Sequence, residues 1–204
     1  MNVVDLDTSL DWTPFDIPGG SAPVQMHVLR DEPATRARTL LVRFPKGWER
    51  FESGFYESAE ELIVLEGALH LCGITFGSGD WGFVPEKHGR YDMSVDEPTV
   101  VFARFFGPAR WVASEVHEEL PLHRALSAAS FEDASPLGAG NASLLRLDEA
   151  WLVSEVPAGV AAPVDTELLS LPSRHWTWTP AGEPLPDLAP PAFCRRFAAE
   201  GGAT

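Results

Sequence analysis

Short runs of apolar residues, separated by turn-forming residues, recur along the chain. The runs are rich in valine, leucine and phenylalanine, and several are apolar at successive positions, as in strands that are covered on both faces. They predict β-strands over residues 24–29, 39–44, 61–65, 69–72, 82–84 and 99–106. Strands at such short, regular spacing are typical of a β-barrel or a β-sandwich.

Turn signals with a clear physical cause lie between these runs. The chain contains 18 prolines and 17 glycines, and they interrupt it too often for long helices. Glycine adopts positive φ without steric cost, and proline fixes φ at a value that suits turns. Such signals occur at Pro45-Lys46-Gly47, Glu66-Gly67, Gly77-Ser78-Gly79-Asp80 and Asp96-Glu97-Pro98. We therefore predict an all-β fold.

The spacing of runs and turns predicts four segments. These are an N-terminal arm with edge strands over residues 1–38, a barrel core over 39–111, a connector over 112–143 and a β-rich C-terminal segment over 144–204.

A weak internal similarity links the last segment to the barrel core. Residues 41–47 resemble residues 152–159, and residues 60–65 resemble residues 166–171. The similarity indicates a shortened and degenerate second repeat. Chance resemblance between two β-rich segments is the alternative.

The charge and cysteine content exclude several classes of partner. The formal net charge is -15 at pH 7, which opposes binding to nucleic acid or to an anionic membrane. Only Cys72 and Cys194 occur, without a C-x-x-C pair, so a disulfide framework is not indicated. No basic amino-terminal signal region occurs, and no apolar run reaches the roughly 18 residues of a spanning helix. We expect a soluble, cytoplasmic protein.

Three segments of the barrel core resemble the two sequence motifs of cupins, in particular of the ChrR-like branch. The resemblance covers about a third of the chain, and its segments are residues 44–48, 60–67 and 79–85. It implies a cupin double-stranded β-helix, or jelly-roll barrel, with a divalent metal at its centre in most members. The C-terminal segment would then be a decayed second cupin repeat.

The residues that would bind this metal are largely absent. The resemblance places a ligand glutamate at Glu60, and the histidine pair of the first motif at Gly54 and Tyr56. The usual spacing of the second motif places its histidine at Arg90, whereas a two-residue deletion would bring His88 into register. We favour the second alignment, so that Glu60 and His88 are the only ligands left. Iron, manganese, nickel or zinc binding stays open as an alternative to a site without cofactor.

The same positions are candidates for acid–base chemistry. We assign catalytic roles to Glu60, His88 and Tyr56: a carboxylate in an apolar barrel can transfer protons, an imidazole titrates near neutral pH, and a phenol can donate to a developing oxyanion. A rim salt bridge, a surface loop and ordinary packing are the respective alternatives. Strand alternation sends Glu60 and Glu61 to opposite faces, so one of the two is expected to be exposed.

The residues beside these positions are assigned to substrate binding. Arg90 can bind a carboxylate through two hydrogen bonds, and Tyr91 and Phe55 supply aromatic surface. A solvated arginine and half-buried packing are the alternatives.

Three hypotheses about function stay open. The first, which we favour, is a metal-independent isomerase, cyclase or lyase that acts on a small polar or aromatic metabolite in the barrel. The second is a metal-dependent cupin dioxygenase with an unusual ligand set, and the third is a non-catalytic ligand-binding or oligomerisation module. We also expect a homodimer, formed through the amino-terminal segment with Trp12 and Phe15, because cupin barrels commonly pair through an added edge strand.

Overall fold

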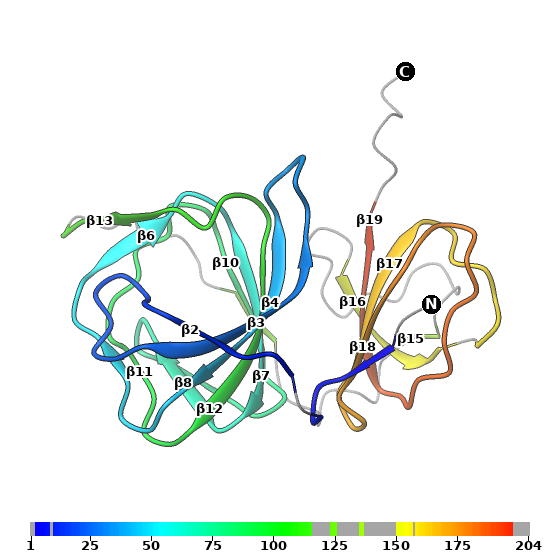
Figure 1. Cartoon of the computed structure of the whole chain (residues 1–204), viewed down its shortest axis with the longest axis horizontal. Helices are drawn as coiled ribbons and strands as arrows, with labels where there is room; N and C mark the ends of the chain where they lie inside the picture. Colours follow the sequence, from blue (N-terminus) through cyan, green and yellow to red (C-terminus); the bar gives the residue numbers. More distant parts are fainter. Residues whose placement is uncertain are drawn as a thin grey trace. The chain divides into compact units, whose positions relative to one another are not determined.

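The computed structural model describes residues 3–8, 10–115, 123–125, 135–136, 150–156 and 158–197, which form β-strands and turns without any helix. The chain divides into two compact units (Figure 1): the barrel unit, Asp11–Ala128, and the second unit, Met1–Leu10 with Ala129–Thr204. The all-β prediction is confirmed. No helix in these stretches has the length and hydropathy needed to cross a membrane.

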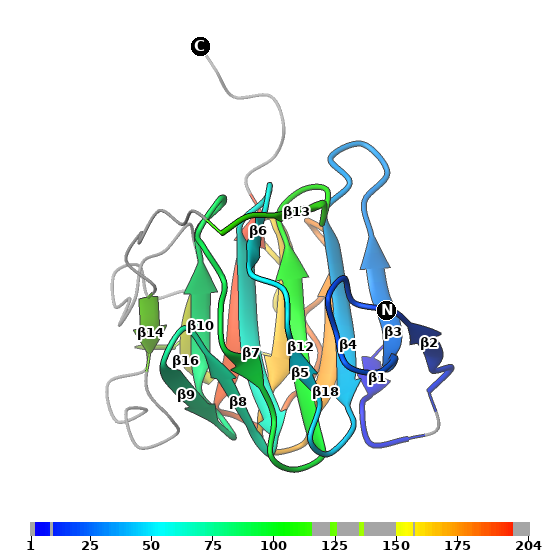
Figure 2. The ribbon, with the colours of Figure 1, turned by 90° about the vertical axis from the view of Figure 1, so that its left-hand side faces the viewer.

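Three sheets make up the barrel unit. Its strands are β2 (Thr13–Phe15), β3 (Val24–Asp31), β4 (Arg38–Phe44), β5 (Glu49–Arg50), β6 (Gly54–Tyr56), β7 (Glu60–Glu66), β8 (Ala68–Leu71), β9 (Ile74–Gly77), β10 (Trp81–Val84), β11 (Met93–Ser94), β12 (Thr99–Phe105), β13 (Trp111–Ala113) and β14 (His123–Ala125). Figure 2 shows the largest sheet, with the order β14-β10-β7-β12-β4-β3-β2. The others have the orders β5-β11-β8-β9 and β13-β6.

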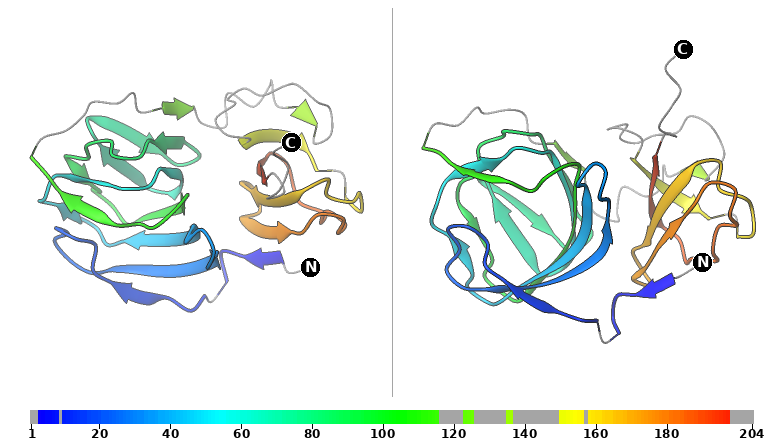
Figure 3. Two further views of the ribbon diagram at one scale, coloured as in Figure 1. Left: turned by 90° about the horizontal axis from the view of Figure 1, so that it is seen from above. Right: turned by 45° about the horizontal axis from the view of Figure 1, so that its top comes forward.

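The strands of the barrel unit run around a closed ring, as the right panel of Figure 3 shows. All pairings described within it are antiparallel, as in a jelly roll. The six strands predicted from the apolar runs correspond to β3, β4, β7, β8, β10 and β12. The predicted turns are also present: Gly47, Gly67 and Gly79 all have positive φ.

The central strands explain why apolar runs were a good signal. All seven residues of β12, and all but the last of β7, are buried. On β7 the side chains of Leu62 and Val64 belong to the barrel core, and alternation places Glu60 on the same, inner face.

Glu60 and Glu61 are both buried, so the expectation that one is exposed is wrong. The Glu61 carboxylate accepts a hydrogen bond of 2.6 Å from Trp81 Nε1, which satisfies one of the acceptors of this buried group.

A single six-stranded sheet forms the second unit. Its strands are β1 (Val3–Asp5), β15 (Ser135–Pro136), β16 (Ala150–Glu155), β17 (Asp165–Ser170), β18 (His175–Thr179) and β19 (Ala192–Phe197), in the order β1-β18-β17-β19-β16-β15. The amino-terminal strand β1 pairs with β18 at the edge of this sheet. The predicted bounds of the four segments stay predictions. Much of the predicted connector, 112–143, lies outside the described residues.

The second unit repeats the strand order of the barrel's central sheet. In chain order, β16, β17, β18 and β19 correspond to β4, β7, β10 and β12, and both sets have the same spatial order. The register agrees as well: Arg104 lies opposite Glu61, and Arg195 opposite Glu167. This correspondence equates residues 60–65 with 166–171, as the sequence similarity does, and so supports the prediction of a second repeat.

A buried side-chain cluster also recurs in the two units. Each unit has a glutamate, a tryptophan and an arginine at matching positions: Glu61, Trp81 and Arg104 in the barrel unit, and Glu167, Trp176 and Arg195 in the second unit. In both, the indole Nε1 donates a hydrogen bond to the glutamate, at 2.6 Å and 3.0 Å respectively. The two units thus share a polar arrangement as well as a strand order.

Candidate functional site

The barrel unit contains a partly open cavity of about 190 Å³. Its walls are mostly apolar and include Val24, Leu40, Val42, Phe44, Met93 and Phe105. Six side chains with ionisable groups also line it: Arg50, Tyr56, Glu60 and Arg90, and the more exposed Asp16 and Arg38. An apolar cavity with a few convergent polar groups is the usual form of a small-molecule site.

The carboxylate of Glu60 forms an ion pair with Arg90. Glu60 opens strand β7, and Arg90 is tied to Gly54 on β6 by two backbone hydrogen bonds, of 2.7 Å and 3.2 Å. Arg90 Nη1 donates to Glu60 Oε2, and the side chains are only 2% and 10% exposed. Because both groups are buried, their charges interact more strongly than a surface pair would.

A second arginine is held by aromatic side chains. Arg50, on the short strand β5, donates a hydrogen bond of 3.0 Å from Nη2 to the hydroxyl oxygen of Tyr56. Its guanidinium carbon lies 4.0 Å from the ring centre of Trp111, and that of Arg90 lies 4.8 Å from the ring centre of Tyr56. Cation–π contacts of this kind stabilise arginine in a desolvated setting.

Both arginines keep buried nitrogen donors that make no hydrogen bond within the described part of the chain. Among the described residues, no hydrogen-bond acceptor meets Nε or Nη1 of Arg50, or Nε or Nη2 of Arg90. The two residues are 7% and 2% exposed. A buried donor without a partner costs about 1–3 kcal/mol, and more when it is charged, so polar groups from outside the chain are expected at these atoms.

The structure brings together half of the residues predicted from the sequence. Glu60, Tyr56 and Arg90 line the cavity, whereas Phe55, His88 and Tyr91 are not among its lining residues. His88 is buried, at 5% exposure, and its backbone nitrogen donates to Pro85. The catalytic role of His88 and the binding roles of Phe55 and Tyr91 stay predictions.

The sequence prediction did not include Arg50, and it assigned Arg90 to substrate binding and not to a contact with Glu60. The usual motif spacing points to position 90, and Arg90 does contact Glu60. The proposed deletion that brought His88 into register is therefore not needed to place a residue beside Glu60. Arg50 follows Gly47 by three residues, and alternation from the buried Trp48 would have directed it inwards.

The site does not fit a divalent metal. Position 54, where the resemblance to the cupin motif implies a histidine, has no room for a side chain: a Cβ there would meet the Val112 carbonyl oxygen and lie 2.6 Å from the Trp111 ring. Two guanidinium groups share the cavity with its one buried carboxylate, and they would repel a cation. Among the described residues, no three histidine, cysteine, aspartate or glutamate side chains gather as metal ligands.

Comparison with known proteins places the chain in a family. The family model described as the ChrR cupin-like domain matches residues 2–110, just over half of the 204 residues. No curated protein matches the sequence significantly. Among solved structures, a protein from Nostoc punctiforme PCC 73102, provisionally named a dioxygenase, has a TM-score of 0.71 at 15% identity, covering 95% of this chain and 81% of that chain.

Two further solved structures are similar over a smaller part. An acetylacetone dioxygenase from Acinetobacter johnsonii has a TM-score of 0.46 at 16% identity, covering 55% of this chain and 78% of its own. Rhodobacter sphaeroides SigE in complex with the anti-sigma ChrR has a TM-score of 0.39 at 19% identity, covering 49% and 51%. At such identities a structural likeness speaks for the fold and leaves function open. The family match and the all-β barrel show that the chain belongs to the ChrR cupin-like domain family and has the cupin fold.

Proposed function

We propose that the barrel unit is a metal-independent acid–base site that converts a small organic molecule. The observation that carries this proposal is the joint presence of a carboxylate and a phenol, Glu60 and Tyr56, in one largely apolar cavity. An isomerisation, a cyclisation or an elimination that begins with proton transfer needs these two groups and no oxidant.

The two groups have complementary roles. The Glu60 carboxylate accepts a proton from a carbon next to a substrate carbonyl, while negative charge develops on the carbonyl oxygen. The Tyr56 hydroxyl accepts a hydrogen bond from Arg50, which leaves its own hydrogen for donation to that oxygen. Return of the proton from Glu60 to a neighbouring carbon completes an isomerisation, so that atoms and charge balance.

Arg90 supports Glu60 in this scheme. Its ion pair with the carboxylate fixes the position of the proton acceptor, and its backbone is anchored on the strand that carries Tyr56. The alternative of a metal-dependent dioxygenase requires a cation in the same cavity, which two arginines oppose. A binding module without catalysis would use the same cavity, so measurement of turnover has to separate the two.

The test combines metal analysis with proton exchange. Protein purified without a metal-affinity tag is analysed for iron, manganese, nickel and zinc, and we expect no stoichiometric metal. Small carbonyl compounds that raise the thermal midpoint are then incubated with the protein in D₂O, and NMR follows deuterium uptake at carbon.

Matched variants then identify the proton acceptor. We expect Glu60→Gln to abolish deuterium uptake while ligand binding persists, and Glu49→Gln, which removes an exposed carboxylate near the barrel, to leave uptake unchanged. Stoichiometric metal, or full uptake in Glu60→Gln, would overturn the proposal. Binding without any uptake would favour the non-catalytic module.

A further inference from the structure

We propose that the ligand of this cavity is an organic carboxylate, bound by Arg90 and Arg50, with an apolar body that lies against the barrel wall. This inference rests on the proposed function, since it names the substrate class of the same site. It follows from the charge, the donor geometry and the shape of the cavity.

The charge of the cavity calls for an anion. Its buried charged side chains are Arg50, Arg90 and Glu60, two cations against one anion. The more exposed Arg38 and Asp16, which also line it, add one charge of each sign. A net positive charge in a low-dielectric interior is costly unless a counter-charge lies nearby. A bound carboxylate would neutralise it, whereas a neutral ligand would leave it in place.

The donor geometry at Arg90 matches a carboxylate group. Nη1 is engaged with Glu60, and the two nitrogens without a partner among the described residues are Nε and Nη2. These two atoms form one edge of the planar guanidinium, with their N–H bonds parallel. That edge is the arrangement that binds both oxygens of a carboxylate.

Arg50 supplies a second contact point. Its Nη2 is held by Tyr56, and its Nε and Nη1 also lack a partner among the described residues. Tyr56 contacts both arginines: its hydroxyl accepts from Arg50, and the guanidinium carbon of Arg90 lies 4.8 Å from its ring centre. A substrate carboxylate on the arginines therefore lies beside the proposed acid and base.

The volume and the apolar walls of the cavity indicate the size and polarity of the rest of the ligand. The volume of about 190 Å³ corresponds to roughly six water molecules at about 30 Å³ each, which is the scale of a carboxylate with one ring or a short chain. The apolar side chains Leu40, Phe44 and Phe105 and the ring of Trp111 line the space. They favour an apolar or aromatic body.

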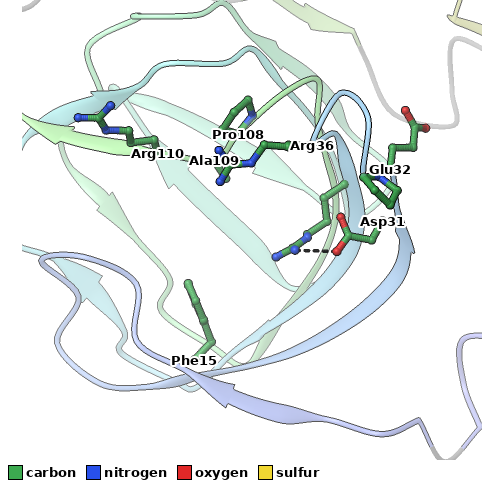
Figure 4. A pocket seen from close by; sticks show the side chains of 9 residues that line it. Phe15, Asp31, Glu32, Arg36, Pro108, Ala109 and Arg110 are labelled. Atoms are coloured by element: carbon green, nitrogen blue, oxygen red, sulfur yellow. Dashed lines mark hydrogen bonds and ion pairs between the residues drawn. The ribbon is translucent and has the colours of Figure 1, made fainter.

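A basic opening adjoins the cavity. A wider pocket of about 590 Å³ shares Phe15, Arg38 and Ala109 with the cavity. Figure 4 shows Phe15 on one side of this pocket and Arg36 and Ala109 on the other. With Arg110 the pocket has three arginines against two acidic residues, on a chain whose net charge is -15. Such a local excess of positive charge steers small anions towards the cavity.

Matched probes test the ligand class. Benzoate, its neutral isostere benzamide and the cation benzylamine, with hexanoate as a chain-like carboxylate, are titrated into the full chain by isothermal titration calorimetry. We expect benzoate or hexanoate to bind at least tenfold more tightly than benzamide, and benzylamine not to bind. Equal affinity for benzoate and benzamide would refute the carboxylate and leave the proposed function standing. Failure of all four probes, together with failure of the neutral carbonyl compounds, would refute both.

Variants show where the carboxylate binds. Arg90→Gln and Arg50→Gln are each expected to weaken binding of the preferred carboxylate about tenfold to a hundredfold, because a charged hydrogen bond contributes about 1.5–3 kcal/mol. The control is Arg43→Gln, which removes the same charge from an exposed position on β4. Unchanged affinity in both cavity variants would mean that water alone meets these donors, and would overturn the inference. If Arg90→Gln does not fold, the affinity of Arg50→Gln and the preference of the wild type for benzoate over benzamide still test whether the ligand is a carboxylate.

Discussion

Removal of Arg90 alone should destabilise the barrel unit much more than removal of Arg90 together with Glu60. The two side chains are 2% and 10% exposed, so Arg90→Met leaves a carboxylate in the interior without its counter-charge. Loss of one partner of a buried ion pair costs about 3–5 kcal/mol, whereas replacement of both partners by apolar residues is often neutral. We therefore expect a cost of about 3–5 kcal/mol for Arg90→Met and a small change for the double variant Glu60→Leu/Arg90→Met.

Urea unfolding at pH 7 measures this difference. The free energy of unfolding is extrapolated to water for the wild type, the two single variants and the double variant, and the four values give the coupling energy of the pair. A cost below about 1 kcal/mol for Arg90→Met, as for a surface ion pair, would refute the reasoning. Additive effects of the two single substitutions would refute it as well.

Three further predictions concern the framework. Gly54→Ala should destabilise the barrel by about 1–3 kcal/mol because its Cβ has no room, which thermal unfolding can measure; an unchanged midpoint would contradict this. Burial raises the pKa of the Cys194 thiol to about 12. The neutral thiol therefore stabilises the fold fully below about pH 9, and this contribution is lost as the pH rises towards 12. In a Cys72→Ser variant, which lacks the other cysteine, alkylation of Cys194 at pH 8 should require unfolding. Glu61→Gln and Glu167→Gln should both weaken their unit, by about 1–3 kcal/mol in urea titrations, and an effect in only one would argue against equivalent clusters.

The sequence predicted the fold well because the signal was local. Strands such as β7 and β12 are buried on nearly all positions, and their apolar runs are therefore continuous. The family resemblance then singled out Glu60, which does line the cavity of the barrel. Positive φ at Gly67 marks a turn that only a residue without a side chain adopts easily.

The site was harder to predict because it depends on contacts between distant residues. Arg50 lies on a two-residue strand, too short for alternation to be recognised without knowing that Trp48 is buried, and its contacts with Tyr56 and Trp111 are visible only in the structure. The sequence showed that the histidine at position 54 was missing, but not that Trp111 occupies its space. The usual motif spacing pointed to position 90, but the ion pair of Arg90 with Glu60 became visible only in the folded barrel.

Two expectations stay predictions. Homodimer formation is untested; β2 is at the edge of its sheet and Phe15 is 44% exposed, whereas Trp12 packs against Arg43 at 4.2 Å. The duplication of a cupin unit is supported by the common strand order and register of the two sheets.

A crystal structure with 4-bromobenzoate would test the central claim most directly, since the anomalous signal of bromine fixes the orientation of the ligand. We predict that the carboxylate lies within hydrogen-bond distance of Nε and Nη2 of Arg90, with the ring among the apolar residues of the cavity. A ligand bound elsewhere on the protein, or a metal ion coordinated by Glu60 in the cavity, would contradict the account.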